Sequence, residues 1–444
     1  MRHGPIRHSR HRGAIIGAIT AAALAAVPVA LARPGQVVTA FGSWGSTSTY
    51  LVTGGEDDAY PIGITAQPDG EILSWGQSRA GMGDRGVTAV RTSSRTGEPG
   101  RRIGNVFIDD SGNMGCECAP TAVAIGLSNR GSAFAGASPG RVNEPRVRPT
   151  IFVANGSGDP DPAFGVRGVV SFDPAPGATG RISSMYESGG RITVAGRAGG
   201  TWFVARLLMT GNLDPAFGAG GIQRGVAALD SVRIAAAPDG GVVLAGLEAV
   251  PDGGDTGRLT IARLTPAGVP DPAFGVLGVR TPAVRDLATQ SLMSLIVAAD
   301  GRIIVGGTTA GPVARRRLAV ARLTAAGAPD GAFGNRGRVI TAPGGLVAFS
   351  GGHLLIDAAK RVYLGGAGRR GAAGARYSVV SRFHTNGTPD VGFGAAGSHV
   401  STRAGSDVTG LVLAPNAVVY GQRRYPDRRF DSVAGMMNLV AISR

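Results

Sequence analysis

The sequence predicts an all-β protein, a seven-bladed β-propeller with four antiparallel strands in each blade. Three observations carry this prediction: a Phe-Gly motif that recurs at near-constant spacing, a hairpin signal in the repeat units, and the lack of a helical pattern of useful length. A fixed period of this size is typical of repeat architectures in which each unit packs against its neighbours.

The recurring motif is Asp-Pro-Ala-Phe-Gly or a near variant, with a second glycine three residues after the first. Five clear copies have their phenylalanines at Phe164, Phe217, Phe274, Phe333 and Phe393. A copy at Phe41 lacks the aspartate, and a degenerate copy at 100–104 lies near the midpoint of the 41–164 interval. Seven units therefore fit between Phe41 and Arg444. Because the motif recurs in nearly every unit, we interpret it as structural: a turn, an apolar side chain between blades, and glycines at positive φ.

Each unit also contains short apolar runs that read as strands. In the fifth unit these are 292–298, 302–307, 318–323 and 338–341, and the first two flank Asp300-Gly301. An Asp-Gly pair between strand-like runs is a strong hairpin signal. Similar turns occur at 68–70 and 238–240. Four short strands per unit match a propeller blade.

The ring is expected to close by strand exchange. An isolated blade cannot bury both faces, and a ring leaves only short, protected edges. If the strand after the Phe-Gly motif is outermost, the propeller begins with an outer strand at 46–52. The seventh blade would combine that strand with three C-terminal strands at 408–414, 417–420 and 436–443. A linear β-solenoid is the alternative, although its repeats are shorter and its strands more uniform.

The N-terminus predicts export. Residues 1–32 have a basic start, an apolar run over 14–31 and a small-residue cleavage site at Ala30-Leu31-Ala32. A membrane anchor is the alternative, but Pro28 breaks the run and no stop-transfer pattern follows. We therefore predict a signal peptide at 1–32, a single propeller domain at 33–444, and a secreted or extracellular monomer without a membrane span in the mature chain.

The chain is basic, with a formal net charge of +15, and Lys360 is the single lysine among its 45 basic residues. The arginines are scattered and aromatic residues are few, which argues against a nucleic-acid partner. Charge of this kind favours attraction to polyanions without determining the fold.

Four repeat units place an arginine eight residues before the motif aspartate. The pairs are Arg206 and Asp214, Arg263 and Asp271, Arg322 and Asp330, and Arg382 and Asp390. We expect each pair to form charge-assisted hydrogen bonds that hold the motif loop on the sheet. Independent, solvated turn charges are the alternative.

Three units depart from this pattern. The first keeps Arg91 without the aspartate, and the second keeps Asp161 opposite Asn155. The seventh lacks the aspartate and is expected to have Ile442 at the arginine position. Loss of both partners together in the seventh unit suggests that they interact.

The run Leu-Asp-Pro-Ala-Phe-Gly-Ala-Gly-Gly at 213–221, with a Pro-Asp-Gly hairpin and an Ala-Arg-Leu strand further along the chain, resembles the delta-60 repeat of secreted bacterial proteins. The resemblance covers about 41–444 and is strongest over 159–400. It implies a propeller-like fold. It implies no activity and no site residues.

The loops that join the second and third strands, and those that join blades, vary in sequence and are rich in arginine. Variable loops on a rigid scaffold commonly carry binding. The candidate ligand-binding residues are Arg197, Arg315, Arg316, Arg317, Arg369, Arg370, Arg423, Arg424, Arg428 and Arg429, with Arg79, Arg85 and Arg376 in the same loops. They predict an anionic polysaccharide, another cell-envelope polymer or a protein as partner. Solvated arginines from compositional bias are the alternative.

Evidence for catalysis is thin. The sequence has no nucleophile elbow, zincin or phosphate-loop motif, and only His353, His384 and His399 lie outside the predicted signal. Cys116 and Cys118 form a C-x-C for which a strained disulfide, a reactive pair and half a metal site are the alternatives. We expect no cofactor and no metal, and the catalytic residues of any enzyme here are unknown.

The sequence thus favours an exported binding or scaffold module. The alternative is an extracellular hydrolase or lyase that acts on carbohydrate with a site at the mouth of the propeller channel, because propellers assemble such sites without a linear motif.

Overall fold

The structure is a computed structural model, and the part of it described here comprises residues 34–43, 46–50, 58–79, 85–106, 123–129, 131–139, 147–249, 257–283, 292–371, 373–404, 406–424 and 436–444. Among these residues, no helix has the length and apolar character needed to cross a membrane. The predicted signal peptide and the two cysteines lie outside the described residues.

The compact unit Ala32–Arg444 contains seven four-stranded antiparallel sheets. Blade one contains β2 (Asp58–Ala66), β3 (Glu71–Arg79), β4 (Arg85–Ser93) and β5 (Pro99–Val106). Blade two contains β6 (Val123–Gly126), β7 (Ser132–Pro139), β8 (Val147–Ala154) and β9 (Val169–Ser171). Blade three contains β10 (Gly180–Ser188), β11 (Arg191–Ala198), β12 (Thr201–Leu208) and β13 (Ile222–Arg224). Blade four contains β14 (Leu229–Ala236), β15 (Val242–Ala249), β16 (Gly257–Leu264) and β17 (Val279–Arg280).

The remaining blades follow the same order until the last. Blade five contains β18 (Leu292–Val297), β19 (Ile303–Thr308), β20 (Leu318–Leu323) and β21 (Arg338–Thr341). Blade six contains β22 (Val347–Ile356), β23 (Val362–Arg369), β24 (Arg376–Phe383) and β25 (Ser398–Val400). Blade seven contains β26 (Ser406–Ala414), β27 (Ala417–Arg424), β28 (Met436–Ser443) and β1 (Ser46–Tyr50). Two short 3₁₀ helices, η1 (Val313–Arg315) and η2 (Pro343–Gly345), complete the described elements.

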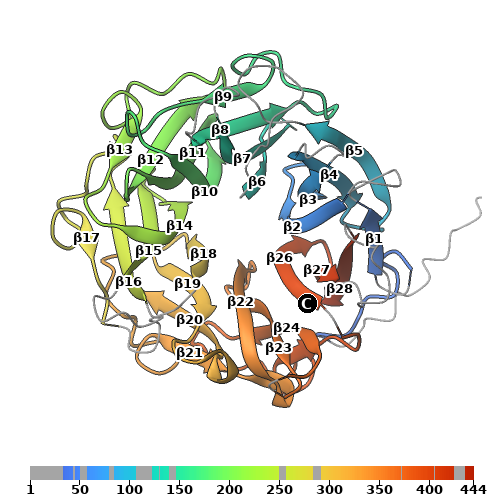
Figure 1. Cartoon of the computed structure of the whole chain (residues 1–444). Coiled ribbons are helices and arrows are strands. Elements are labelled where there is room, and N and C mark those ends of the chain that lie inside the picture. The colour runs from blue at the N-terminus through green and yellow to red at the C-terminus, as the bar shows by residue number, and fades with distance from the viewer. Residues whose placement is uncertain are drawn as a thin grey trace, which may run out of the picture. The chain divides into compact units, whose positions relative to one another are not determined.

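The first strand of each blade contacts the first strand of the next, from β2 through β6, β10, β14, β18 and β22 to β26, which contacts β2 again. The sheets therefore form a closed ring around a central axis, as Figure 1 shows. The prediction of a seven-bladed propeller with four antiparallel strands per blade is confirmed.

The seventh sheet joins the two ends of the propeller. Strand β1 pairs antiparallel with β28, and Ser46 lies opposite Val440. Chain segments almost 400 residues apart thus share one blade, with the N-terminal strand at its outer edge.

One detail of the predicted repeat is wrong. Residues 100–104, which we interpreted as a degenerate motif, belong to the outer strand β5, where Ile103 pairs with Ala89. In blade one a short turn over 93–98 replaces the longer motif loop, and Gly97 in that turn has φ of 73°. The chain therefore enters the outer strand earlier than the repeat spacing predicts.

The motif phenylalanines are buried between blades. Phe217 and Phe333 have no exposed surface, and Phe41 is 2% exposed. A Cβ atom on Gly268 of blade four would lie 2.6 Å from the ring of Phe217 in blade three, which explains the glycine. The two glycines of the Phe217 copy, Gly218 and Gly221, have φ of 56° and 96°. The structural interpretation of the motif is therefore confirmed.

The ring has two faces that differ in regularity. The turns between the first and second strands and the motif loops lie on one face, which we call the hairpin face. We call the loop face the one that carries the connections between the second and third strands and between blades. The sequence repeats on the hairpin face and varies on the loop face.

Candidate binding site

The four predicted Arg–Asp pairs are ion pairs in the structure. Donor–acceptor distances are 2.9 Å for Arg206 and Asp214, 3.0 Å for Arg263 and Asp271, 2.8 Å for Arg322 and Asp330, and 2.8 Å for Arg382 and Asp390.

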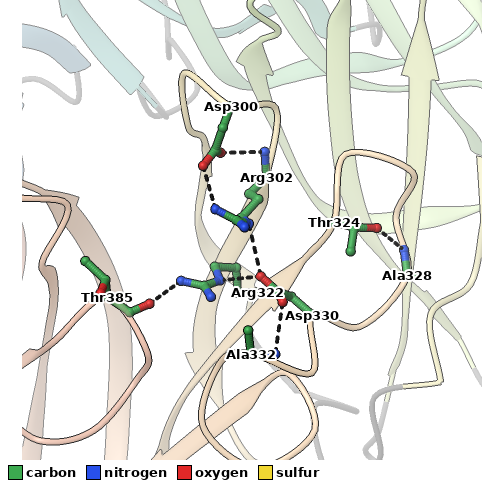
Figure 2. Close-up of polar contacts among 8 residues, drawn as sticks. All are labelled: Asp300, Arg302, Arg322, Thr324, Ala328, Asp330, Ala332 and Thr385. Atoms are coloured by element: carbon green, nitrogen blue, oxygen red, sulfur yellow. Dashed lines mark hydrogen bonds and ion pairs between the residues drawn. The ribbon is translucent and has the colours of Figure 1, made fainter.

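In blade five, the Asp330 backbone amide donates to the Arg322 carbonyl at 2.9 Å, and the Ala332 amide donates to the Asp330 carboxylate at 3.0 Å. Figure 2 shows this arrangement, in which the carboxylate also contacts Arg302 of the neighbouring hairpin. The aspartate therefore joins the motif loop to the third strand and to the first hairpin of its own blade.

Two of these arginines also reach the next blade. Arg206 donates to the carbonyl of Pro266 in blade four at 2.8 Å, and Arg322 donates to the carbonyl of Thr385 in blade six (Figure 2). The guanidinium of Arg322 lies 4.5 Å from the centre of the Phe333 ring, a cation–π distance. Each such arginine links an aspartate, a motif phenylalanine and the adjacent blade, so its role is structural.

Burial and hydrogen bonding act in opposite directions on Asp214. Burial raises the pKa of this carboxyl, but the hydrogen bond from the Ala216 amide and the charges of Arg206 and Arg191 outweigh it. The net pKa is lowered from its ordinary value, so Asp214 is ionised at neutral pH.

Blade one replaces the missing aspartate with other carboxylates. Arg91 contacts Asp69 at 3.3 Å and Glu71 at 3.6 Å, both from the hairpin between β2 and β3. The sequence pattern did not predict these partners because they precede the arginine in the chain.

In blade two, Asn155 does not face Asp161 as expected. The Asn155 side chain accepts from the amides of Ser157 and Asp159, and the Asp161 backbone amide donates to the Val153 carbonyl. Val153, eight residues before Asp161, therefore occupies the arginine position.

Blade seven also differs from the expectation in its register. The Val38 amide donates to the Ala441 carbonyl at 2.9 Å, the bond that Asp214 and Arg206 make in blade three. Ala441, rather than Ile442, therefore stands at the arginine position, and Val38 at the aspartate position. The one-residue error arose because the motif of this blade comes from the opposite end of the chain.

The predicted arginines of blades five, six and seven form a continuous series on the loop face. The Phe349 amide donates to the Arg316 carbonyl at 3.0 Å, which places the 315–317 segment against the start of β22. There Val347 pairs with Arg369, and Arg369 pairs with Arg376.

The series continues into blade seven. Arg376 donates to Asp407 at 2.8 Å, and Asp407 pairs along the sheet with Arg423, whose guanidinium is 3.8 Å from its carboxylate. We call this set the arginine arc; its members are Arg315, Arg316, Arg317, Arg369, Arg370, Arg376 and Arg423.

Several guanidinium groups of the arc point to solvent. Arg315, Arg317 and Arg370 are exposed, and Arg370 lies 5.0 Å from the centre of the Tyr377 ring. The Asp407 carboxylate contacts two arginines of the arc, Arg376 and Arg423, whereas the arc contains seven arginines. The arc is therefore strongly cationic.

Other predicted arginines do not join the arc. Arg197 lies on blade three, where it is ion-paired with Asp230 of blade four. Arg424 is the last residue of β27, and Arg428 and Arg429 lie outside the described residues.

The inner strands hold two charged or titratable groups that the sequence analysis did not select. Arg233 on β14 donates to the carbonyls of Val232, Met293 and Ser183, in three different blades, and burial lowers its pKa to about 10. The signal for this group in the sequence was an arginine next to the apolar residues Val232 and Ile234 of the strand Leu229–Ala236.

His353 on β22 is the second inner-strand group. Burial, assisted by the charge of Arg233, lowers its pKa to about 4. The His353 side chain is therefore neutral at pH 7. It also forms a hydrogen bond with the backbone of Val408 in blade seven.

A polar groove of about 950 Å³ is lined by residues of blades six, seven and one, but two of the lining residues, His399 and Tyr420, hold the closing segment. His399 Nδ1 donates to the Gly35 carbonyl at 2.9 Å, so its Nε2 accepts from the Tyr420 hydroxyl at 3.0 Å. Burial lowers the pKa of His399 and raises that of Tyr420, which keeps both neutral. Among the described residues, no group of three or more His, Cys, Asp and Glu side chains is placed to hold a metal ion.

The fold and its repeated inter-blade links define the chain as a β-propeller repeat protein. A family model described as a domain of unknown function, DUF5122, beta-propeller, matches residues 188–217 and 298–333, which lie in blades three and five. No curated protein matches the chain.

Solved structures that are similar to the chain include proteins with different named activities. A protein of unknown function from Dyadobacter fermentans has 12% identity and a TM-score of 0.43, covering 90% of this chain and 100% of that one. The PQQ-bound aldose sugar dehydrogenase of Streptomyces coelicolor has 13% identity and a TM-score of 0.40, covering 92% and 100%. The Penicillium chrysogenum alpha-L-arabinanase in complex with arabinobiose has 10% identity and a TM-score of 0.41, covering 89% and 98%.

Proposed function

We propose that the protein is an exported propeller of the delta-60 repeat type that binds an anionic polymer of the cell envelope through its arginine arc. The observation that carries this proposal is the continuity of the arc across three blades, from Arg316 through Arg369 and Arg376 to Arg423. The basic start and apolar run of residues 1–32 support export.

The geometry favours an extended, repeating anion over a compact one. The exposed guanidinium groups of Arg315 and Arg317 are on blade five, whereas Arg370 is on blade six. A polymer that carries regularly spaced carboxylates or phosphates can contact several of them at once, and planar guanidinium groups suit both kinds of anion. Tyr377, against which Arg370 stacks, adds an apolar surface next to the charges.

The test uses the mature chain from residue 33 and two soluble probes, polygalacturonate and poly(glycerol phosphate). We expect saturable binding at low ionic strength that weakens as salt increases, because exposed charges are screened. The variant R315E/R317E/R370E should raise the dissociation constant at least tenfold.

The matched control is R95E/R167E/R336E, which makes the same charge change at three exposed arginines of the hairpin face. It should alter the dissociation constant less than threefold. Equal losses in both variants would show unspecific charge attraction and would refute the arc as a site. Cleavage of polygalacturonate by the wild-type chain would favour the carbohydrate-acting enzyme instead.

A further inference from the structure

The hairpin face contains a cavity that the proposed function does not use. It lies between blades five and six and has a volume of about 630 Å³, within the range of small-molecule sites. Its floor is apolar and includes Ile296, Ile304, Ile356 and Val362. The two blades therefore do not pack completely against each other at this end.

The inner strand of blade five shows the same incomplete packing. In β18, Leu292 is buried, but the next five residues are all half-buried, including Ile296. Ile304 and Val362, deeper in the same interface, are each 2% exposed. The cavity thus opens the edge of a hydrophobic core to the outside.

The mouth of the cavity is charged, and most of its charges are already paired. Arg302 contacts Asp300 at 2.7 Å and Asp330 at 3.1 Å, and Arg322 contacts Asp330 and the Thr385 carbonyl (Figure 2). These groups form a fixed polar rim.

Two further charged groups stand on the blade-six side of the rim. Asp357 accepts from Arg361 at 2.7 Å and from the Tyr363 hydroxyl at 3.2 Å. The Lys360 side chain, by contrast, is exposed, and its positive charge helps to lower the pKa of Asp300 on the same rim. Its ammonium group is the rim charge left to meet a ligand.

The backbone of Lys360 has an unusual conformation for a residue with a side chain. Its amide donates to the Asp357 carbonyl at 2.8 Å, the turn bond that Gly240 makes to Ala237 and Gly301 makes to Ala298. Lys360 has φ of 60°, a left-handed conformation that is unfavourable for a side chain with a Cβ atom and easy for glycine. Blade six therefore carries the single lysine of the chain where blades four and five carry glycine.

We propose that this cavity binds a small organic monoanion with an apolar body, such as an aliphatic or aromatic carboxylic acid. The carboxylate contacts Lys360 at the rim, and the apolar body lies along Ile296 and Ile356 on the floor. The ammonium group would repel a cation, and a fully polar ligand would leave the floor without a partner. The site lies on the face opposite the arginine arc and goes beyond the proposed function.

The test measures binding of decanoate by titration calorimetry below its micelle concentration, with decanol and decyltrimethylammonium as comparison ligands. Wild-type protein should bind decanoate at one site, bind decanol at least tenfold more weakly, and bind the cation least. K360M removes the charge and keeps the side-chain length. The affinity for decanoate should therefore fall at least tenfold, while the affinity for decanol stays unchanged.

Two further variants separate the site from the fold. K360G should lose decanoate affinity as K360M does but raise the melting temperature, because glycine relieves the left-handed backbone. A298F should fill the cavity and weaken decanoate and decanol together. R336M, which removes an exposed charge elsewhere on the same face, should leave decanoate binding unchanged.

Absence of saturable decanoate binding by wild-type protein at 1 mM would overturn the proposal, as would equal affinity of wild type and K360M. Unchanged affinity in A298F would do the same. Polymer binding by the arginine arc, on the other face, is measured with the same variants. The two proposals can therefore fail or succeed independently.

Discussion

Blades three to six and blade seven solve the same structural problem with different chemistry. In blades three to six, an arginine on the third strand holds the aspartate of the motif loop. In blade seven, Ala441 and Val38 stand at those positions, and the loop comes from the other end of the chain. Both kinds of blade nevertheless keep the same backbone bond, 2.8 Å between Asp214 and Arg206 and 2.9 Å between Val38 and Ala441.

The comparison shows which contacts all these blades share and which contact only the regular blades have. The shared features are the backbone bond and the buried motif phenylalanine, which is Phe41 in blade seven. A third shared feature is the bond from the motif glycine to the next blade, 2.6 Å from Gly42 to Thr96 and 2.7 Å from Gly334 to Asn386. The ion pair is an addition found where loop and strand are close in sequence.

The largest expected effect follows from removing the segment that completes blade seven. Deleting residues 33–50 from the mature chain removes β1, Phe41 and the bond from Gly394 to Pro34. We expect a loss on the order of 5 kcal/mol or more, since burial of one such phenylalanine alone contributes about 3 to 5 kcal/mol. The measurement is urea unfolding followed by circular dichroism.

The control for the deletion is F41A, which keeps the strand and removes only the ring. It should lose about 3 kcal/mol and retain a single cooperative transition. A deletion variant that unfolds at the same urea concentration as the intact mature chain would show that strand exchange does not stabilise the ring.

The second prediction tests the ion pair of the regular blades. D330A should cost about 3 kcal/mol, because it leaves the largely buried Arg322 without its counter-charge. R322M should cost less than D330A, because Arg302 still contacts Asp330. The double variant should cost clearly less than the sum of the two, as expected for residues that interact directly. Additive losses would show that the two charges act independently.

Blade two supplies the matched control for that cycle. Asp161 receives the amide of Ala163 at 2.9 Å but faces Val153 instead of an arginine. D161A should therefore cost about 1 kcal/mol, the contribution of one hydrogen bond. A cost equal to that of D330A would mean that the turn, and not the ion pair, determines the effect.

The same contrast explains how far the sequence could predict the fold. The motif recurs, so the number of blades, the strands of blade five and the pairing of Arg322 with Asp330 could be predicted from spacing alone. Blade one could not, because its arginine turns to Asp69 and Glu71 on an earlier hairpin. Contacts that recur in each repeat can be predicted from the spacing. Contacts made by a segment that replaces the motif loop in one blade leave no periodic signal in the sequence.

The candidate sites were predictable only in part. Arginine-rich loops could be found by composition, but their continuity depends on Asp407, which precedes its strand partner Arg423 by 16 residues and lies 31 residues after Arg376. Arg197 has the same composition signal and belongs elsewhere, because Asp230 lies beside it. The cavity at Lys360 has no sequence signal except a lysine where the hairpins of blades one, four and five have Gly70, Gly240 and Gly301.

The third prediction concerns the junction between the regular blade six and the exchanged blade seven. The pKa of His353 is lowered to about 4, mainly by burial, with Arg233 adding to the effect and Asp407 opposing it. The unfolded chain binds a proton near pH 6.5 and the folded chain does not, so stability is complete above that pH and falls as the pH drops towards 4.

We expect the wild-type protein to lose about 2 kcal/mol more than H353Q between pH 7 and pH 4.5. The measurement is the free energy of unfolding in urea at several pH values. Parallel pH profiles for the two proteins would show that His353 does not report on this junction.

The smallest effect is expected where an ion pair joins two regular blades at the surface. Arg197 of blade three and Asp230 of blade four have side chains that are 31% and 58% exposed. Water solvates and screens such a pair, so R197M should change the free energy of unfolding by no more than about 0.5 kcal/mol. The same chemical change at Arg322 is expected to cost several times more. A loss of stability in R197M as large as that in R322M would contradict this prediction. It would show that an exposed ion pair between blades stabilises the ring as much as a buried one.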